Sequence, residues 1–157
     1  MWELESGDTL RTLQGRPFSV QSIASTAGGR WLVASILFDR LYVWDLENGE
    51  QVRTLYGHTS ELIAVGLAPD GCRVVSGSWD NTVRVWDLKA GRELVRFTVD
   101  VPVTACSVAQ DSRTIAVGDC FGRVHFLRLI EPDPTEPAIG ETKIQLLQHK
   151  QPGNDCS

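Results

Sequence analysis

The side chains best suited to chemistry in this sequence are a histidine, two serines and two aspartates near its middle. His58 could act as a general base or a metal ligand, and the hydroxyls of Ser76 and Ser78 could act as nucleophiles. Neither serine has the flanking glycines of a nucleophile elbow. Asp45 and Asp87 each follow a tryptophan at the same place in a repeat, and repetition explains them better than acid–base work. We therefore predict that the chain is not an enzyme.

No metal or cofactor site is predicted. His125 and His149 have no cysteine, histidine or carboxylate partner at ligand spacing. No phosphate-binding loop of the G-x-x-x-x-G-K-[ST] type occurs in the sequence. The cysteines lack Cys-x-x-Cys spacing and predict reduced thiols in a cytoplasmic protein. They are Cys72, Cys106, Cys120 and Cys156.

Charge and hydropathy exclude two classes of partner. The net charge of −5 argues against nucleic acid and anionic membrane surfaces, because both favour a basic protein. No apolar run approaches the ~18 residues of a membrane-spanning helix. We expect neither a nucleic-acid nor a membrane partner.

A hairpin pattern ending in tryptophan recurs through the chain. Residues 74–87 contain two runs rich in Val, Thr and Trp around the turn residues Asp80 and Asn81, which predicts a β-hairpin. Trp2, Trp44 and Trp86 are 42 residues apart, and a glycine lies five residues after each. A period of ~40–45 residues with Trp-Asp endings is typical of four-stranded propeller blades.

These residues resemble the WD40 repeat family over about residues 2–129. The best repeat begins with Gly57-His58 and ends with Trp86-Asp87. The resemblance implies a structural tetrad of hydrogen-bonded side chains at His58, Ser76, Asp80 and Trp86. The chemistry suits this role, because a buried indole N–H needs an acceptor and a serine hydroxyl can link it to the imidazole.

The other repeats depart from that pattern, and we expect apolar packing to hold them. The repeat anchors are Trp2, Trp44, Asp45, Asp87 and Phe126, where Phe126 stands for the tryptophan of the last repeat. The first full repeat has Arg16, Ala34 and Phe38 at the His, Ser and Asp positions. The last has Asp100, Ala116 and Cys120 there.

The predicted fold is all-β: a partial WD40 propeller of about three four-stranded antiparallel blades, followed by a disordered tail. The propeller covers 1–130, with repeats at about 1–46, 47–88 and 89–130. The tail, 131–157, opens with three prolines and three acids in seven residues, which cannot feed a sheet ladder. Within the tail, residues 144–147 are either inert or a short recognition segment.

Three blades leave apolar faces at both ends, because propellers close with typically ~4–8 blades. We expect the missing blades to lie on a longer parent chain. A truncated isoform without independent activity is the alternative. The last repeat is also similar to the C-terminal WD40 segment of NACHT and WD repeat domain-containing proteins, which implies a sensor or autoinhibitory segment of a signalling ATPase.

The expected function is a non-catalytic scaffold that binds proteins or peptides on the loop face of the propeller. The resemblance implies partner contacts at Trp79, Thr59 and Glu61. Tryptophan is enriched in binding hot spots, so its presence at a turn favours a binding role. The alternative is that Trp79 packs on a neighbouring loop.

Overall fold

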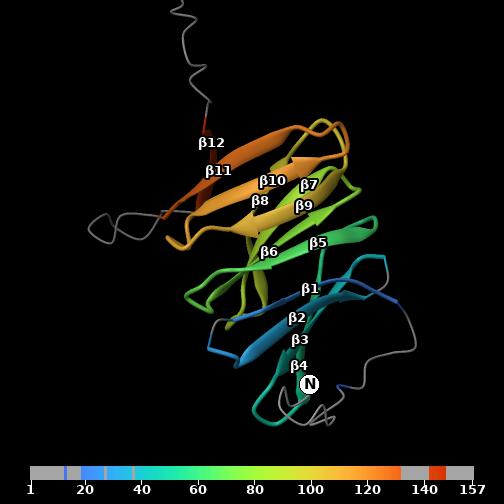
Figure 1. Cartoon of the computed structure of the whole chain (residues 1–157), viewed down its shortest axis with the longest axis vertical. Helices are drawn as coiled ribbons and strands as arrows, with labels where there is room; N and C mark the ends of the chain where they lie inside the picture. Colours follow the sequence, from blue (N-terminus) through green and yellow to red (C-terminus); the bar gives the residue numbers. More distant parts are fainter. Residues whose placement is uncertain (1–12, 14–18, 27, 37, 132–141, 148–157) are drawn as a thin grey trace, which may run out of the picture.

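The computed structural model describes residues 13, 19–26, 28–36, 38–131 and 142–147. All regular structure in these residues is β-strand, arranged as three four-stranded antiparallel sheets that follow one another along the chain. Figure 1 shows the sheets stacked along the long axis of the molecule. This architecture agrees with the predicted partial propeller, and each sheet is called a blade below.

Each blade is an up-and-down meander with its first strand at one edge, so the strands occur in chain order across the sheet. Blade 1 contains β1 (Val20–Ser25), β2 (Trp31–Ile36), β3 (Arg40–Asp45) and β4 (Glu50–Tyr56). Blade 2 contains β5 (Leu62–Leu67), β6 (Arg73–Ser78), β7 (Thr82–Asp87) and β8 (Arg92–Thr98). Blade 3 contains β9 (Val103–Val108), β10 (Thr114–Asp119), β11 (Val124–Ile130) and β12 (Lys143–Leu147).

Turn residues end the strands where the sequence predicts. Gly71 has a φ of +69° in the β5–β6 turn, a conformation that glycine adopts without steric cost. Asn81 has a φ of +64° in the β6–β7 turn, and asparagine tolerates this left-handed region better than most residues. These tight turns keep successive strands antiparallel and adjacent.

The blades pack face to face through two apolar layers. The first strands β1, β5 and β9 lie beside one another, so the blades share a common inner edge. One buried cluster between blades 1 and 2 is centred on Trp86, and another between blades 2 and 3 includes Val83 and Val85. Burial on both sides explains why the strands of blade 2 are apolar on both faces.

The same residues of each repeat face the same neighbour, as a rotational arrangement requires. Blade 2 repeats the ladder register of blade 1 after 42 residues, whereas blade 3 repeats that of blade 2 after only 41. The equivalent pairs are Trp31–Asp45, Arg73–Asp87 and Thr114–Arg128.

This shorter spacing corrects the anchor predicted for the last repeat. The position of Trp86 is taken by Leu127, which is fully buried, and not by Phe126, whose side chain points to the other face and is 43% exposed. Aligning an aromatic ring with an aromatic ring placed the anchor one residue early. Burial on the blade 2 side, not ring chemistry, defines the position.

The prediction of a disordered tail over 131–157 is wrong for one segment. Residues 143–147 form β12, which pairs with β11 from Ile130–Lys143 to Phe126–Leu147 and completes the third sheet. Ile144 packs against the cluster between blades 2 and 3, which gives this short strand an apolar anchor. The outer strand of blade 3 therefore comes from a segment that was predicted to be part of the tail. The rest of the predicted tail lies outside the described residues, apart from Glu131 and Thr142.

Gly77→Ala is expected to lower the free energy of unfolding by about 1–3 kcal/mol, because a new Cβ would overlap the buried side chain of Val103. Urea denaturation followed by circular dichroism measures the change. Gly28→Ala is the matched control, since nothing lies within 4 Å of a Cβ there. Equal stability of the two variants would contradict close blade packing at Gly77.

Candidate functional site

The four side chains of the expected tetrad come from four consecutive parts of blade 2. His58 lies in the connection between β4 and β5, Ser76 on β6, Asp80 in the β6–β7 turn and Trp86 on β7. Pairing of β6 with β7 places the serine and the tryptophan on the same face, toward blade 1. The structure thus brings together all four residues that the sequence singled out.

A continuous chain of hydrogen bonds joins them. The indole Nε1 of Trp86 donates to Ser76 Oγ at 2.8 Å, and Ser76 Oγ lies 2.7 Å from His58 Nε2. His58 Nδ1 lies 2.8 Å from Asp80 Oδ2. Because Asp80 can only accept, the imidazole carries its proton on Nδ1 and accepts the serine hydroxyl proton at Nε2.

A second layer of polar groups, which the sequence did not suggest, surrounds this chain. The hydroxyl of Thr82 donates to Asp80 Oδ1 at 2.6 Å, and the backbone N–H of Thr59 donates to Asp80 Oδ2 at 3.0 Å. The buried Arg84 donates to Glu93 at 2.7 Å and lies 3.7 Å from Asp80. Every buried side-chain nitrogen and oxygen among the described residues has a partner.

Burial and hydrogen bonding determine the charge of the two titratable side chains of the tetrad, His58 and Asp80. Burial lowers the pKa of His58 and outweighs the hydrogen bond and charge of Asp80, which act in the opposite direction. Burial would raise the pKa of Asp80, but hydrogen bonds from Thr82, Thr59 and His58 hold it below its usual range. At neutral pH the pair is a neutral imidazole beside a carboxylate.

This arrangement fits a structural role better than a catalytic one. Ser76 is fully buried, and its hydroxyl is already shared between the indole and the imidazole. No group of three His, Cys, Asp or Glu residues within the described segments could hold a metal ion. The described part of the chain also has no helix long and apolar enough to cross a membrane.

Blades 1 and 3 have other residues at the positions of the tetrad and its turn. In blade 1, Ala34 replaces the serine, and the buried Trp44 packs with Ile36 and Tyr42, as expected. In blade 3, Leu127 packs in an apolar cluster, as expected, and the buried Asp119, which takes the position of Ser78, adds a polar group. Sequence spacing did not single out this aspartate, because it precedes the turn instead of lying within it.

Asp119 organises the β10–β11 turn on its own. It accepts backbone N–H bonds from Phe121 and Arg123, and its Oδ2 lies 2.7 Å from the Arg123 Nε and 3.0 Å from His125 Nε2. Burial opposes ionisation, but these bonds hold the pKa of Asp119 well below its usual range. Asp119 thus accepts both turn N–H bonds that blade 2 divides between Ser78, which accepts from Asp80, and Asp80, which accepts from Thr82.

The predicted aspartate anchors hold the turns at the opposite end of the blades. Asp45 Oδ1 accepts the N–H of Glu47 at 2.9 Å, and Asp87 Oδ1 accepts that of Ala90 at 2.8 Å. Both are therefore turn-stabilising groups, which agrees with the role expected from repetition. Trp2, the remaining anchor, lies outside the described residues.

The candidate partner residues lie together on the loops above the tetrad. The backbone N–H of Trp79 donates to the carbonyl of Glu61 at 2.9 Å, and that of Thr59 donates to Asp80. Trp79 is 53% exposed, so a large part of its surface is accessible to a partner. The hydrogen-bonded backbone fixes the place from which this ring projects.

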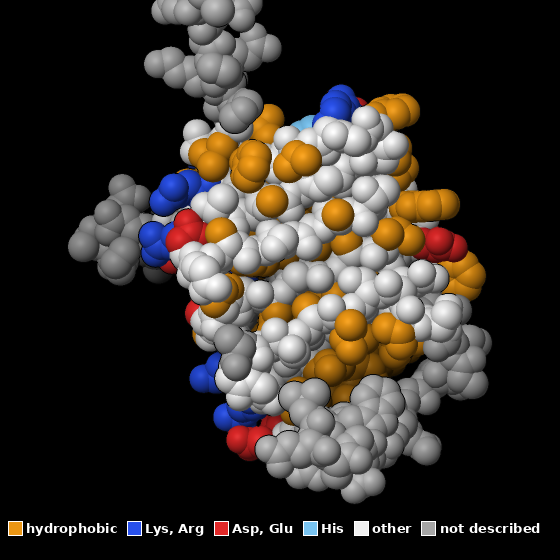
Figure 2. Space-filling view, viewed as in Figure 1, with side chains coloured by type: hydrophobic (Ala, Val, Ile, Leu, Met, Phe, Trp, Pro, Cys, Tyr) orange, Lys and Arg blue, Asp and Glu red, His pale blue; other side chains and the backbone are white. Residues whose placement is uncertain are grey.

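Two further aromatic residues share this end of the molecule. Phe38 lies in the β2–β3 turn and Phe121 in the β10–β11 turn, and their side chains are 62% and 74% exposed. These turns are equivalent to the one that carries Trp79, and all three lie on the right in Figure 1. Figure 2 shows hydrophobic side chains projecting from that edge. The sequence alone did not group these two phenylalanines with Trp79. Phe38 occupies the position matched to Asp80, and Phe121 comes one residue after Cys120, which was matched to Asp80 in the last repeat.

The fold is that of part of a β-propeller assembled from repeated four-stranded blades. The family model described as WD domain, G-beta repeat matches residues 49–87, from the start of β4 to the end of β7. This match supports the WD40 family and coincides with the repeat that contains the tetrad. No curated protein matches the chain. Nothing in these matches supports the narrower resemblance to NACHT and WD repeat domain-containing proteins.

Ser76→Ala is expected to lower the free energy of unfolding by about 2–4 kcal/mol, because it leaves the Trp86 indole N–H and His58 Nε2 buried without partners. Chemical denaturation monitored by tryptophan fluorescence measures this loss. Ser107→Ala, at an exposed position on β9, serves as the control. A loss no greater than that of the control would contradict a stabilising tetrad.

Stability is expected to fall as the pH drops from about 7 to 5. The folded state holds His58 at a lowered pKa, so the unfolded chain binds a proton first, near pH 6.5. The loss approaches about 1.4 kcal/mol per pH unit until the folded-state pKa is reached. Unfolding free energies measured at several pH values should show a shallower dependence for His58→Gln. Parallel curves for the two proteins would contradict this origin.

Proposed function

We propose that this chain is a non-catalytic protein-interaction domain of WD40 type that docks proteins or peptides on its aromatic turn face. That face is defined as Phe38, Trp79 and Phe121 with the flanking Thr59 and Glu61. The observation that carries the proposal is the exposure of one large aromatic side chain from the equivalent turn of every blade. WD40 domains typically bind proteins or peptides and are generally non-catalytic.

The aromatic turn face suits binding because its backbone is fixed before a partner arrives. The tetrad holds Asp80, Asp80 holds the N–H of Thr59, and the neighbouring Trp79 is tied to Glu61. A preorganised loop loses little conformational entropy on association. Exposed aromatic side chains at such positions provide large contact areas and are enriched in interface hot spots.

We also propose that these blades belong to a larger propeller. On the outer face of blade 3, Val124 and Phe126 are exposed, although the equivalent residues of blade 2, Val83 and Val85, are fully buried against a neighbour. A further blade would bury this face in the same way. The parent chain is the proposed source of that blade, and the scaffold role is proposed for the completed ring.

The cytoplasm is the proposed location of the domain. Cys72, Cys106 and Cys120 are free thiols in the structure. Burial raises the pKa of the Cys106 thiol to about 12, which keeps it unreactive at neutral pH. These properties support a reducing compartment.

Trp79→Ala is expected to remove partners captured from a lysate while leaving the fold intact. Affinity capture with quantitative mass spectrometry measures the loss, and circular dichroism checks the fold. Val52→Ala is the control, because it shortens an exposed apolar side chain on the outer strand β4. An unchanged set of captured proteins with Trp79→Ala would contradict the choice of the aromatic turn face.

A further inference from the structure

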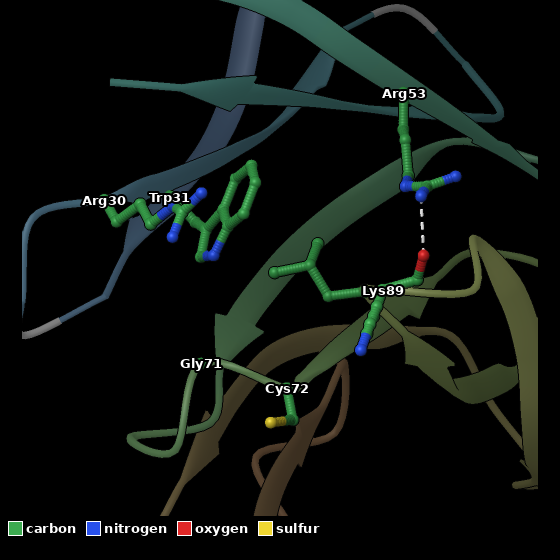
Figure 3. A pocket seen from close by; sticks show the side chains of 7 residues that line it. Arg30, Trp31, Arg53, Gly71, Cys72 and Lys89 are labelled. Atoms are coloured by element: carbon green, nitrogen blue, oxygen red, sulfur yellow. Dashed lines mark hydrogen bonds between the residues drawn. The ribbon is translucent and has the colours of Figure 1, made fainter. Parts of the chain in front are cut away.

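A second candidate binding site lies at the opposite end of the molecule from the aromatic turn face. It is a cleft of about 330 Å³ between blades 1 and 2, bounded by the β1–β2 turn, the middle of β4 and two turns of blade 2. Figure 3 shows Arg30, Trp31 and Arg53 on one side and Cys72 and Lys89 on the other. We call it the basic cleft, because three of its lining residues are cationic.

The cations of the basic cleft are held in place but keep most of their charge uncompensated. The Arg53 guanidinium donates to the backbone carbonyl of Lys89 at 2.5 Å, a bond that crosses between the blades. Arg30 lies over the ring of Trp31 at 5.0 Å and 3.8 Å from Asp45, with more than half of its side chain exposed. Within the described residues, neither Arg53 nor Lys89 forms an ion pair with a carboxylate.

The interface between blades 2 and 3 has an acid at the corresponding end of the blades. Between blades 2 and 3, the carboxylate of Glu131 lies 2.7 Å from Arg73 of blade 2 and 3.1 Å from Arg113 of blade 3. The 41-residue shift that superimposes blade 3 on blade 2 places Glu131 on Ala90, in the turn beside Lys89. Where blade 3 has Glu131, blade 2 has the methyl group of Ala90 next to Lys89.

We infer that the basic cleft binds an acidic, extended segment of a partner protein. A carboxylate of that segment would pair with Arg53 and Lys89, which pair with no carboxylate of the described residues. An adjacent apolar side chain would lie against Trp31 and Leu88, which form the apolar part of the wall. A nucleic acid fits less well, because the chain is acidic overall and the positive charge is confined to a few side chains.

This site is independent of the proposed aromatic turn face. The two lie at opposite ends of the blades, and no residue is shared between them. A partner, or two partners, could therefore contact both ends of the propeller at once. Loss of binding at one site would leave binding at the other unchanged. The variants Trp79→Ala and Arg53→Glu therefore test the two sites separately.

The test uses a fluorescein-labelled peptide, Gly-Leu-Ile-Glu-Pro-Asp-Leu-Gly, whose binding is followed by fluorescence anisotropy. We expect Arg53→Glu to weaken binding about tenfold or more, because it replaces an attractive charge with a repulsive one. Arg128→Glu makes the same charge change at an exposed position on β11 and should bind like the wild type. Added salt should also weaken binding.

Two matched peptides decide the chemistry of the ligand. Replacing the acids with Gln and Asn should abolish binding, and replacing Leu and Ile with Gly should weaken it about tenfold by removing contacts with the apolar wall. Equal binding of the amide peptide would overturn the proposal. So would equal binding of the glycine peptide, or full competition by inorganic phosphate at equal concentration, because either result indicates a simple anion site.

Cys72 reports the location of the bound peptide directly. Its exposed thiol lines the basic cleft, whereas the exposed Cys120 lies in the β10–β11 turn at the other end of blade 3. The bound peptide should slow alkylation of Cys72 by iodoacetamide and leave Cys120 unaffected, as measured by mass spectrometry of the digested protein. Equal rates with and without peptide, for a peptide that binds, would place binding elsewhere and overturn the assignment.

Discussion

The buried indole of Trp86 imposes the constraint from which the best-formed part of this structure follows. Packing a blade against its neighbour removes this ring from water, and its N–H then requires an acceptor. Ser76 provides one, but its own hydroxyl must be satisfied in turn, which draws in His58 and then Asp80. The chain of hydrogen bonds ends just beneath the surface, where the carboxylate of Asp80 accepts bonds from the loops around it. These hydrogen bonds thereby link the buried indole N–H of Trp86 to the loops of the aromatic turn face.

The other blades show that the constraint belongs to the packing and not to a fixed set of residues. Trp44 is buried in blade 1 without a serine beside it, in a layer formed by apolar side chains. Leu127 replaces the tryptophan in blade 3 and removes the need for an acceptor there. The turn above it still needs support, and Asp119 provides it with bonds to Arg123 and His125. All three blades bury apolar side chains face to face, whereas the polar groups that support their turns differ.

Repetition made much of this predictable from the sequence. The strands, the turns and the four tetrad residues could be located because equivalent side chains recur at a nearly constant spacing. Matching an aromatic ring with an aromatic ring caused the error at Phe126, since blade 3 repeats after 41 residues and Leu127 occupies the anchor. The proline-rich segment after Glu131 hid β12, because a break in the pattern does not show that the chain returns to the sheet.

Other features could not be predicted, because they exist only after the blades stack. Arg30, Arg53 and Lys89 are dispersed over two repeats, and nothing in their local sequence suggests that they meet. The aromatic turn face has the same origin, since equivalent turns of separate blades converge on one end. Stacking therefore gives the two ends of the blades different chemistry, apolar at one and cationic at the other. Arg53 also bonds to the backbone of the next blade, so the cationic end contributes a polar bond to the same interface that buries Trp86.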